Sequence, residues 1–131
     1  MLKKLNSRKG FTLIELLIVV AISGIIAAIA VPTLVSTRGA ALESKAKSNL
    51  RALSSAQAAY IAKNGTYGSW AELLADNYLD SRWTAGFTED GVTYNESQNG
   101  SGLQQFEGEA VIPAPVSATW FIDETGELQK R

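Results

Sequence analysis

A long uncharged segment near the start of the chain limits what this sequence can fold into. Residues 16–35 are twenty consecutive residues without Asp, Glu, Lys or Arg, and most of them are Leu, Ile, Val or Ala. A helix of that length spans about 30 Å, because the rise is roughly 1.5 Å per residue, and this matches the hydrocarbon core of a bilayer. The segment therefore predicts a membrane-spanning helix.

The charges around this segment are distributed unequally. Four of the twelve basic residues lie in residues 1–10, which contain no acidic residue, and all thirteen acidic residues follow. Because basic residues are retained on the cytoplasmic side of a membrane, residues 1–10 are predicted to stay in the cytoplasm, with the body outside. The eight basic and thirteen acidic residues of 11–131 give a net charge of −5. This charge repels phosphate, so no nucleic-acid binding is predicted.

Two residue types that carry much enzyme and metal chemistry are missing from the sequence. Without Cys, the chain has no disulfide, no thiolate metal site and no cysteine for a lipid anchor. Without His, it lacks the commonest general base and the commonest zinc ligand. The sequence therefore predicts no enzyme activity, no metal site and no cofactor.

The apolar segment is compatible with two kinds of proteolytic processing. Ala28-Ile29-Ala30 fits the small-x-small pattern of a secretory signal peptide, and cleavage after Ala30 would release a soluble binding domain. A cut after Gly10 would instead leave the helix on the mature protein. Glu15 favours the second alternative, because a carboxylate costs about 2.5–3.5 kcal/mol at mid-membrane and so calls for a functional reason.

The residues around this acid resemble a known processing signal. The run Gly10-Phe11-Thr12-Leu13-Ile14-Glu15, with its basic leader and apolar helix, is similar to the N-terminus of the type IV pilin family. This family includes the pseudopilins of type II secretion. The resemblance implies cleavage between Gly10 and Phe11 by a membrane aspartic peptidase and N-methylation of Phe11. It also implies pairing of Glu15 with the Phe11 amine of a neighbouring subunit.

Elementary chemistry is consistent with these implied roles. Gly10 has no side chain, so the backbone can enter a peptidase cleft in extended form. Pairing between Glu15 and the new amine would neutralise two charges in an apolar bundle and fix the register between subunits. The alternative is an interfacial Glu15 that reaches towards the lipid headgroups and has no specific partner.

Two residues within the apolar segment weaken the helix. Pro32 has no amide hydrogen to donate and its ring clashes with the preceding turn, so a kink is predicted there. Gly24 lowers helix propensity eight residues earlier. The resemblance implies a loss of helical order in filaments between Gly24 and Pro32, and a simple bend is the alternative.

An amphipathic pattern follows Arg38 and Gly39. Apolar or neutral residues recur at steps of three and four: Leu42, Ala46, Leu50, Leu53, Gln57, Tyr60 and Ile61. Asn64-Gly65 is a typical helix end, so one helix is predicted from about residue 11 to 64. Ser69 and Glu72 match a capping box, which predicts a short second helix to about Leu79.

The C-terminal third has the pattern of short strands. Two hairpins are predicted, one around Asp90-Gly91 between Trp83 and Tyr94, and one around residues 123–126. Residues 95–102 are predicted to form an exposed loop. Residues 106–116 are predicted to contain a strand that Pro113 and Pro115 restrict to an edge or a bend.

Together these patterns predict an α+β fold, with a long N-terminal helical spine packed on a small antiparallel sheet. The predicted parts are a cleaved leader (1–10), a transmembrane and filament-core half helix (11–38) and a globular head (39–131). The resemblance implies a pilin that polymerises with itself into a type IV pilus for adhesion, motility or DNA uptake. A type II secretion pseudopilin is the alternative, and the released soluble domain is a third possibility.

The resemblance also implies partners and locations. Before assembly the subunit would cross the inner membrane once and meet the prepilin peptidase and methyltransferase. An ATPase motor and an assembly platform would then move it into an extracellular pilus.

The head contains other candidate sites. Asp123, Glu124 and Glu127 could hold calcium, but their spacing lacks the alternating acids of a calcium loop, so a solvated turn is predicted. Three Asn-x-Ser/Thr triplets begin at Asn64, Asn95 and Asn99. The eleven aromatic residues could support electron conduction along a filament, but their positions favour core packing.

Overall fold

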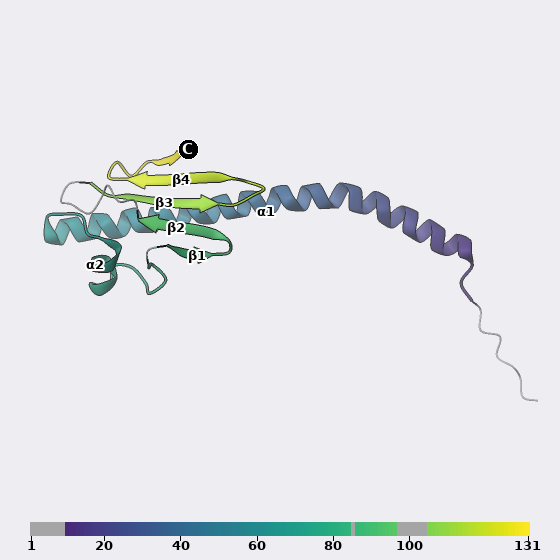
Figure 1. The fold of residues 1–131 in the computed structure, drawn as a ribbon, viewed down its shortest axis with the longest axis horizontal. Helices are drawn as coiled ribbons and strands as arrows, with labels where there is room; N and C mark the ends of the chain where they lie inside the picture. The colour runs from purple at the N-terminus through teal and green to yellow at the C-terminus, as the bar shows by residue number, and fades with distance from the viewer. Residues whose placement is uncertain (1–9, 85, 97–104) are drawn as a thin grey trace, which may run out of the picture. The chain divides into compact units, whose positions relative to one another are not determined.

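The computed structural model describes residues 10–84, 86–96 and 105–131. The chain divides into two compact units, Met1–Ser36 and Thr37–Arg131. The predicted three-part division at residues 10 and 38 remains a prediction. The elements are α1 (Leu13–Asn64), α2 (Trp70–Ala75), β1 (Phe87–Glu89), β2 (Val92–Glu96), β3 (Glu107–Ile112), β4 (Ala118–Asp123) and β5 (Leu128–Lys130) (Figure 1).

Helix α1 confirms the long predicted helix, beginning two residues later than expected and ending at Asn64. Gly65 ends it because its φ of 76° lies in the left-handed region, which a glycine enters without steric cost. The Gly65 amide donates to the Ile61 carbonyl at 2.8 Å and satisfies part of the open helix end. Lys63 in the last turn complements the partial negative charge at this end.

Helix α2 begins as predicted but is shorter. Ser69 and Glu72 form both hydrogen bonds of the capping box. The helix ends at Ala75 rather than near Leu79, because Asn77 adopts a φ of 58°. The amides of Asn77 and Tyr78 donate back to Leu74 and Leu73, at 3.2 and 2.8 Å, which is the Schellman arrangement that closes a helix.

The five strands form one antiparallel sheet in the order β1-β2-β3-β4-β5. Both predicted hairpins are confirmed, and the Asp90-Gly91 turn has positive φ at both positions, as a two-residue hairpin of type I′ requires. Pro113 and Pro115 follow β3 and lie in its turn to β4. The sheet order makes β3 the central strand, so of the two predicted alternatives, an edge or a bend, the bend at the prolines is confirmed.

The predicted loop at residues 95–102 is partly corrected. Asn95 and Glu96 belong to β2, where they pair with Glu109 and Gly108 of β3. Their polarity suggested a loop, but Asn95 also donates a hydrogen bond at 2.8 Å to the side chain of Glu109, which suits the exposed face of a half-buried sheet. Residues 97–102 of the predicted loop lie outside the described part of the chain.

The head core forms where the second half of α1 packs on the sheet. Ala46, Leu50 and Leu53 are fully buried against strand residues such as Ala110 and Ile122. Figure 1 shows the strands beside this half of the helix. Gly108 allows the close approach, because a Cβ there would overlap the Leu53 side chain. The α+β class is thus confirmed.

Aromatic rings fill the part of the core beneath α2 and the first hairpin. Trp70 and Trp83 meet edge to face with ring centroids 5.2 Å apart, and Phe87 stacks on Tyr94 at 4.6 Å. Trp70, Trp83 and Tyr94 are buried. These contacts confirm the predicted core role for those residues, and such pairs contribute about 0.5–1.5 kcal/mol beyond area burial.

One buried amide holds the loop between α1 and α2. Gln57, which is 1% exposed, donates to the Gly68 carbonyl at 2.7 Å and accepts from the Gly68 amide at 3.1 Å. A Cβ on Gly68 would lie 2.7 Å from Leu73 and 2.8 Å from the Tyr60 ring. The bond from the Gly68 amide to Gln57 requires an amide hydrogen, which a proline at this position would lack.

Charged side chains fasten the first hairpin to α1. Lys45 of α1 forms ion pairs with Glu89 and Asp90, and Arg82 contacts Asp80 and Glu89, each at 2.9 Å. Hydrogen bonds from Lys45 lower the pKa of Asp90, and those from Arg82 lower the pKa of Asp80. Burial opposes the change at Glu89, but hydrogen bonds from Asn49, Arg82 and Lys45 still lower its pKa.

Acid is therefore expected to destabilise the head through this network. A carboxylate with a lowered folded pKa stabilises the fold above its unfolded pKa, and this contribution is lost as the pH falls through the folded value. Lys45→Gln should make the free energy of unfolding depend less on pH below about 4. Denaturant unfolding at several pH values measures this slope.

Lys63→Gln is the matched control, because the described ion pairs do not include Lys63. Burial raises the pKa of Glu96, which acts in the opposite direction, but this contribution is common to both variants and cancels in their comparison. Equal slopes in Lys45→Gln and Lys63→Gln would contradict the role of the network.

Candidate functional site

The predicted cleavage position lies just before α1. Gly10, Phe11 and Thr12 are not helical, and the helix begins at Leu13. Phe11 is 84% exposed, and a Cβ on Gly10 would meet no atom of the described residues within 4 Å. The bond between Gly10 and Phe11 is therefore sterically open, as an extended substrate of a peptidase must be. Cleavage and methylation themselves remain predictions.

Glu15 takes part in a hydrogen-bonded cap at the start of α1. Its Oε2 accepts from the Thr12 amide at 2.8 Å and from the Thr12 hydroxyl at 2.7 Å. The Glu15 amide in turn donates to Thr12 Oγ1 at 3.3 Å. These reciprocal bonds are those of a capping box, in which residues at N-cap and N3 satisfy each other's amides.

Thr12 is the site residue that sequence reasoning missed. Thr12-x-x-Glu15 before an apolar run is the same signature that correctly predicted the start of α2 at Ser69. The signal was present, but neither predicted role of Glu15 included a partner within its own chain. The structure gives this carboxylate two donors within its own chain, so it is not a lone acid.

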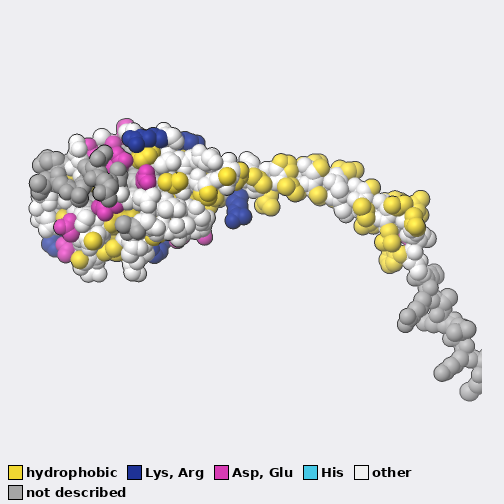
Figure 2. Space-filling view, in the orientation of Figure 1, with side chains coloured by type: hydrophobic (Ala, Val, Ile, Leu, Met, Phe, Trp, Pro, Cys, Tyr) yellow, Lys and Arg dark blue, Asp and Glu magenta, His cyan; other side chains and the backbone are white. Residues whose placement is uncertain are grey.

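The surface that follows Glu15 is strongly apolar. Exposed large side chains cover α1 from Leu13 to Val35, including Leu17 at 59% and Ile29 at 69% exposed. Figure 2 shows hydrophobic side chains along this part of the helix. By length and composition, α1 contains a segment able to cross a membrane. An apolar surface of this size in water is unstable unless lipid or protein covers it.

Gly24 and Pro32 both lie inside α1, which runs past both residues without a break. Hydroxyl groups bond back to the preceding turn near each of them, from Ser23 to the Val19 carbonyl at 2.7 Å and from Thr33 to Ile29 at 3.0 Å. Side-chain bonds of this kind, to the carbonyl four residues earlier, slightly destabilise a helix and often bend it. The loss of helical order between Gly24 and Pro32 concerns the filament and stays a prediction.

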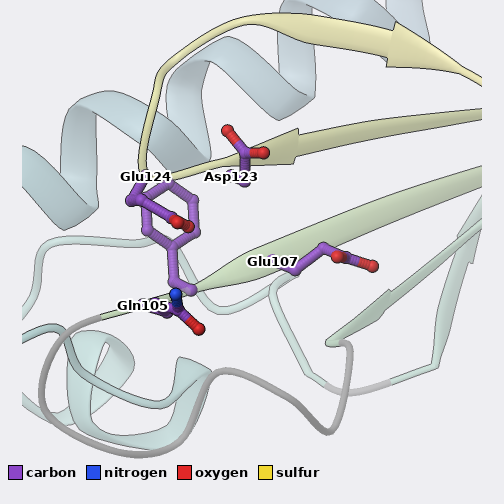
Figure 3. A pocket seen from close by; sticks show the side chains of 5 residues that line it. Gln105, Glu107, Asp123 and Glu124 are labelled. Atoms are coloured by element: carbon purple, nitrogen blue, oxygen red, sulfur yellow. The ribbon is translucent and has the colours of Figure 1, made fainter.

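The acidic turn considered for calcium borders a small cavity of about 160 Å³. Its lining consists of Gln105, Phe106, Glu107, Asp123 and Glu124 (Figure 3). Asp123 Oδ1 accepts from the amide of Thr125 at 2.9 Å, as in an ordinary turn. Within the described ranges, no group of three or more acids is close enough together to hold a metal ion. The Thr125 contact supports the predicted turn, whereas the absence of calcium binding stays a prediction.

The three Asn-x-Ser/Thr triplets differ in their surroundings. Asn64 is exposed at the end of α1, whereas Asn95 is engaged with Glu109 on the sheet. Asn99 lies outside the described residues. No contact of the described residues supports glycan attachment at Asn64 or Asn95.

Taken together, the fold and the site define a class of protein. An N-terminal helix suited to a membrane begins at an exposed, non-helical junction with an acid near its start, and it continues into a small α+β head. Residues 5–31 match the prokaryotic N-terminal methylation motif. This match includes Gly10, Phe11, Thr12 and Glu15.

Comparison with characterised proteins gives related results. The chain is 48% identical over 63 residues to the type IV major pilin protein PilA of Myxococcus xanthus. This aligned stretch covers 48% of this chain and 29% of PilA. It is 36% identical over 103 residues to a fimbrial protein of Pseudomonas aeruginosa. This aligned stretch covers 79% of this chain and 60% of the fimbrial protein. It is 38% identical over 66 residues to the type II secretion system core protein G of Vibrio cholerae. This aligned stretch covers 50% of this chain and 45% of core protein G.

The motif and these relatives show that the chain is similar to type IV pilins, to a fimbrial protein and to a type II secretion core protein. The chain covers less than two thirds of the length of each of the three relatives. The family resemblance drawn from residues 10–15 is thereby confirmed.

Proposed function

We propose that this protein is a structural subunit that polymerises into a type IV pilus serving adhesion, motility or DNA uptake. The observation that carries the proposal is the methylation motif at residues 5–31, which leads directly into a helix with an uncovered apolar surface. A membrane can cover this surface in the monomer, and the helices of other copies can cover it in a filament. Similarity to a major pilin and to a fimbrial protein supports the same function.

Before assembly, the subunit crosses the inner membrane once. The basic residues of 1–10 hold the leader in the cytoplasm, and the acidic head lies outside. A membrane aspartic peptidase cuts between Gly10 and Phe11, and a methyltransferase modifies the new amine. The open geometry around Gly10 supports cleavage at this bond.

Assembly then places residues 11–38 in the filament core and residues 39–131 at its surface. Glu15 of one copy pairs with the Phe11 amine of a neighbour, which sets the axial offset between subunits. The segment from Gly24 to Pro32 loses helical order at this stage. An ATPase and a membrane platform drive the transfer, because leaving lipid gives no hydrophobic gain.

The role is structural rather than enzymatic. The chain has neither His nor Cys, and its acidic head does not favour nucleic-acid binding. The working partner is therefore another copy of the same chain, together with the assembly machinery. Any DNA uptake would depend on the filament rather than on a DNA site on this head.

A second candidate function is that of a pseudopilin in a type II secretion system. The similarity to core protein G of Vibrio cholerae favours it. The N-terminal motif is common to both candidates, so it does not separate them.

Deletion of this chain alone tests the two candidates together. Loss of surface fibres, seen by electron microscopy and restored by the wild-type chain, is the result expected for a pilin. Retained fibres with loss of secreted enzymes from the medium would favour the pseudopilin. No change in either would contradict both.

A further inference from the structure

We propose that Thr12 is a positioning residue that orients the Glu15 carboxylate for subunit assembly. This inference rests on the proposed function, because it assigns Thr12 a part in the pairing between Glu15 and the Phe11 amine of a neighbour. Thr12 itself does not touch that amine. It acts through the carboxylate that does.

The geometry divides the two oxygens of Glu15 between two tasks. Both Thr12 donors bind Oε2, the hydroxyl at 2.7 Å and the amide at 2.8 Å. Oε1 receives no hydrogen bond from the part of the chain that the structure describes. The cap therefore leaves one oxygen open for a cationic donor from another copy.

The cap also lowers the conformational cost of assembly. A free glutamate has several rotamers, and ordering a long side chain at an interface is unfavourable. Thr12 holds Glu15 in one rotamer before any partner arrives, and hydrogen bonds to a charged acceptor are stronger than those to a neutral one. A preorganised carboxylate therefore binds the incoming amine more tightly than a mobile one does.

The same bonds operate throughout the life of the subunit. The Thr12 amide and hydroxyl both lie after the bond between Gly10 and Phe11, so cleavage removes neither donor. In the membrane they compensate the carboxylate before a second subunit is available, which reduces the cost of keeping a charge near lipid. Thr12 thus serves Glu15 in the precursor and in the processed chain.

The test compares four full-length variants in cells: Thr12→Val, Thr12→Ser, Glu15→Ala and Ser23→Ala. Valine keeps the shape of threonine but has no hydroxyl, whereas serine keeps the hydroxyl. Ser23→Ala removes a hydroxyl from the same apolar helix without touching Glu15. Filament yield is measured in the sheared surface fraction, and processing is measured by the mass of the membrane-bound chain.

A spectroscopic readout separates positioning from a purely structural effect. In detergent micelles, the isotope-edited infrared band of a ¹³C-labelled Glu15 carboxylate reports its hydrogen bonds. We expect Thr12→Val to shift this band and to lower filament yield about tenfold, as the loss of one charge-assisted hydrogen bond implies. Thr12→Ser should restore both values, and Ser23→Ala should change neither.

The outcomes distinguish this inference from the proposed function. If Glu15→Ala blocks assembly but Thr12→Val assembles normally, the role of Thr12 is refuted while the pilin function stands. The role is also refuted if Thr12→Ser fails as Thr12→Val does, or if the Glu15 band does not move. If Glu15→Ala itself assembles normally, the pairing fails and the inference fails with it.

Discussion

Replacing Glu15 with alanine is expected to abolish filaments while cleavage after Gly10 continues. The neighbouring Phe11 ammonium would then lie in an apolar bundle without its counter-charge, and removing one partner of a buried pair costs about 3–5 kcal/mol. A loss of this size lowers an association constant by more than about a hundredfold. Immunoblots of sheared surface material and of membranes measure the two steps separately.

Glu43→Ala is the matched control for this experiment. Glu43 also lies on α1, but its carboxylate forms surface ion pairs with Lys47 at 3.9 Å and Lys130 at 3.1 Å. Exposed pairs contribute about 0–1 kcal/mol, so filament yield should stay close to that of the wild type. Normal filaments from the Glu15→Ala variant would refute the pairing.

Replacing Gln57 with leucine is expected to lower the free energy of unfolding of the head by about 2–4 kcal/mol. The buried amide and carbonyl of Gly68 would both lose their partner, and each unsatisfied buried group costs about 1–3 kcal/mol. Denaturant unfolding of the full chain in micelles, followed by the fluorescence of buried Trp70 and Trp83, measures this loss.

Gln129→Leu controls for the change in side-chain chemistry. Gln129 is exposed on β5 and takes part in no side-chain hydrogen bond of the described residues. Its replacement should shift the unfolding free energy by less than about 0.5 kcal/mol. A Gln57→Leu variant as stable as the Gln129→Leu variant would show that the Gly68 loop is held by other contacts.

Local signals predicted most of the fold. The end of α1 at Asn64-Gly65, the start of α2 at Ser69 and the turn at Asp90-Gly91 each depend on residues adjacent in sequence. Chemistry of this kind acts within one turn of a helix or hairpin, so a single sequence contains it. The apolar run of α1 was equally clear, because it depends only on composition and length.

Features that depend on distant contacts were not predictable. Gly108 lies in a central strand because α1 approaches it closely, and Gly68 is needed because Gln57 lies eleven positions earlier and points towards it. Neither partner is visible in a local pattern. The end of α2 was also misjudged, because an asparagine can extend a helix or, as Asn77 does here, close it.

The candidate site was predicted in part. The motif identified Gly10, Phe11 and Glu15, which lie at the start of α1, and their roles in cleavage, methylation and assembly stay predictions. The donors supplied by Thr12 change the physical account, because Glu15 is already hydrogen-bonded before a second copy binds. Under the proposed function, charge neutralisation by a neighbour would complete a preorganised site rather than rescue an unpaired acid.

The N-terminus of the mature protein tests the central claim most directly. Mass spectrometry of the chain recovered from surface filaments should identify an N-terminal peptide that begins with methylated Phe11 and retains the apolar helix. A chain that instead begins at Val31, recovered as a soluble monomer from the medium, would contradict the account.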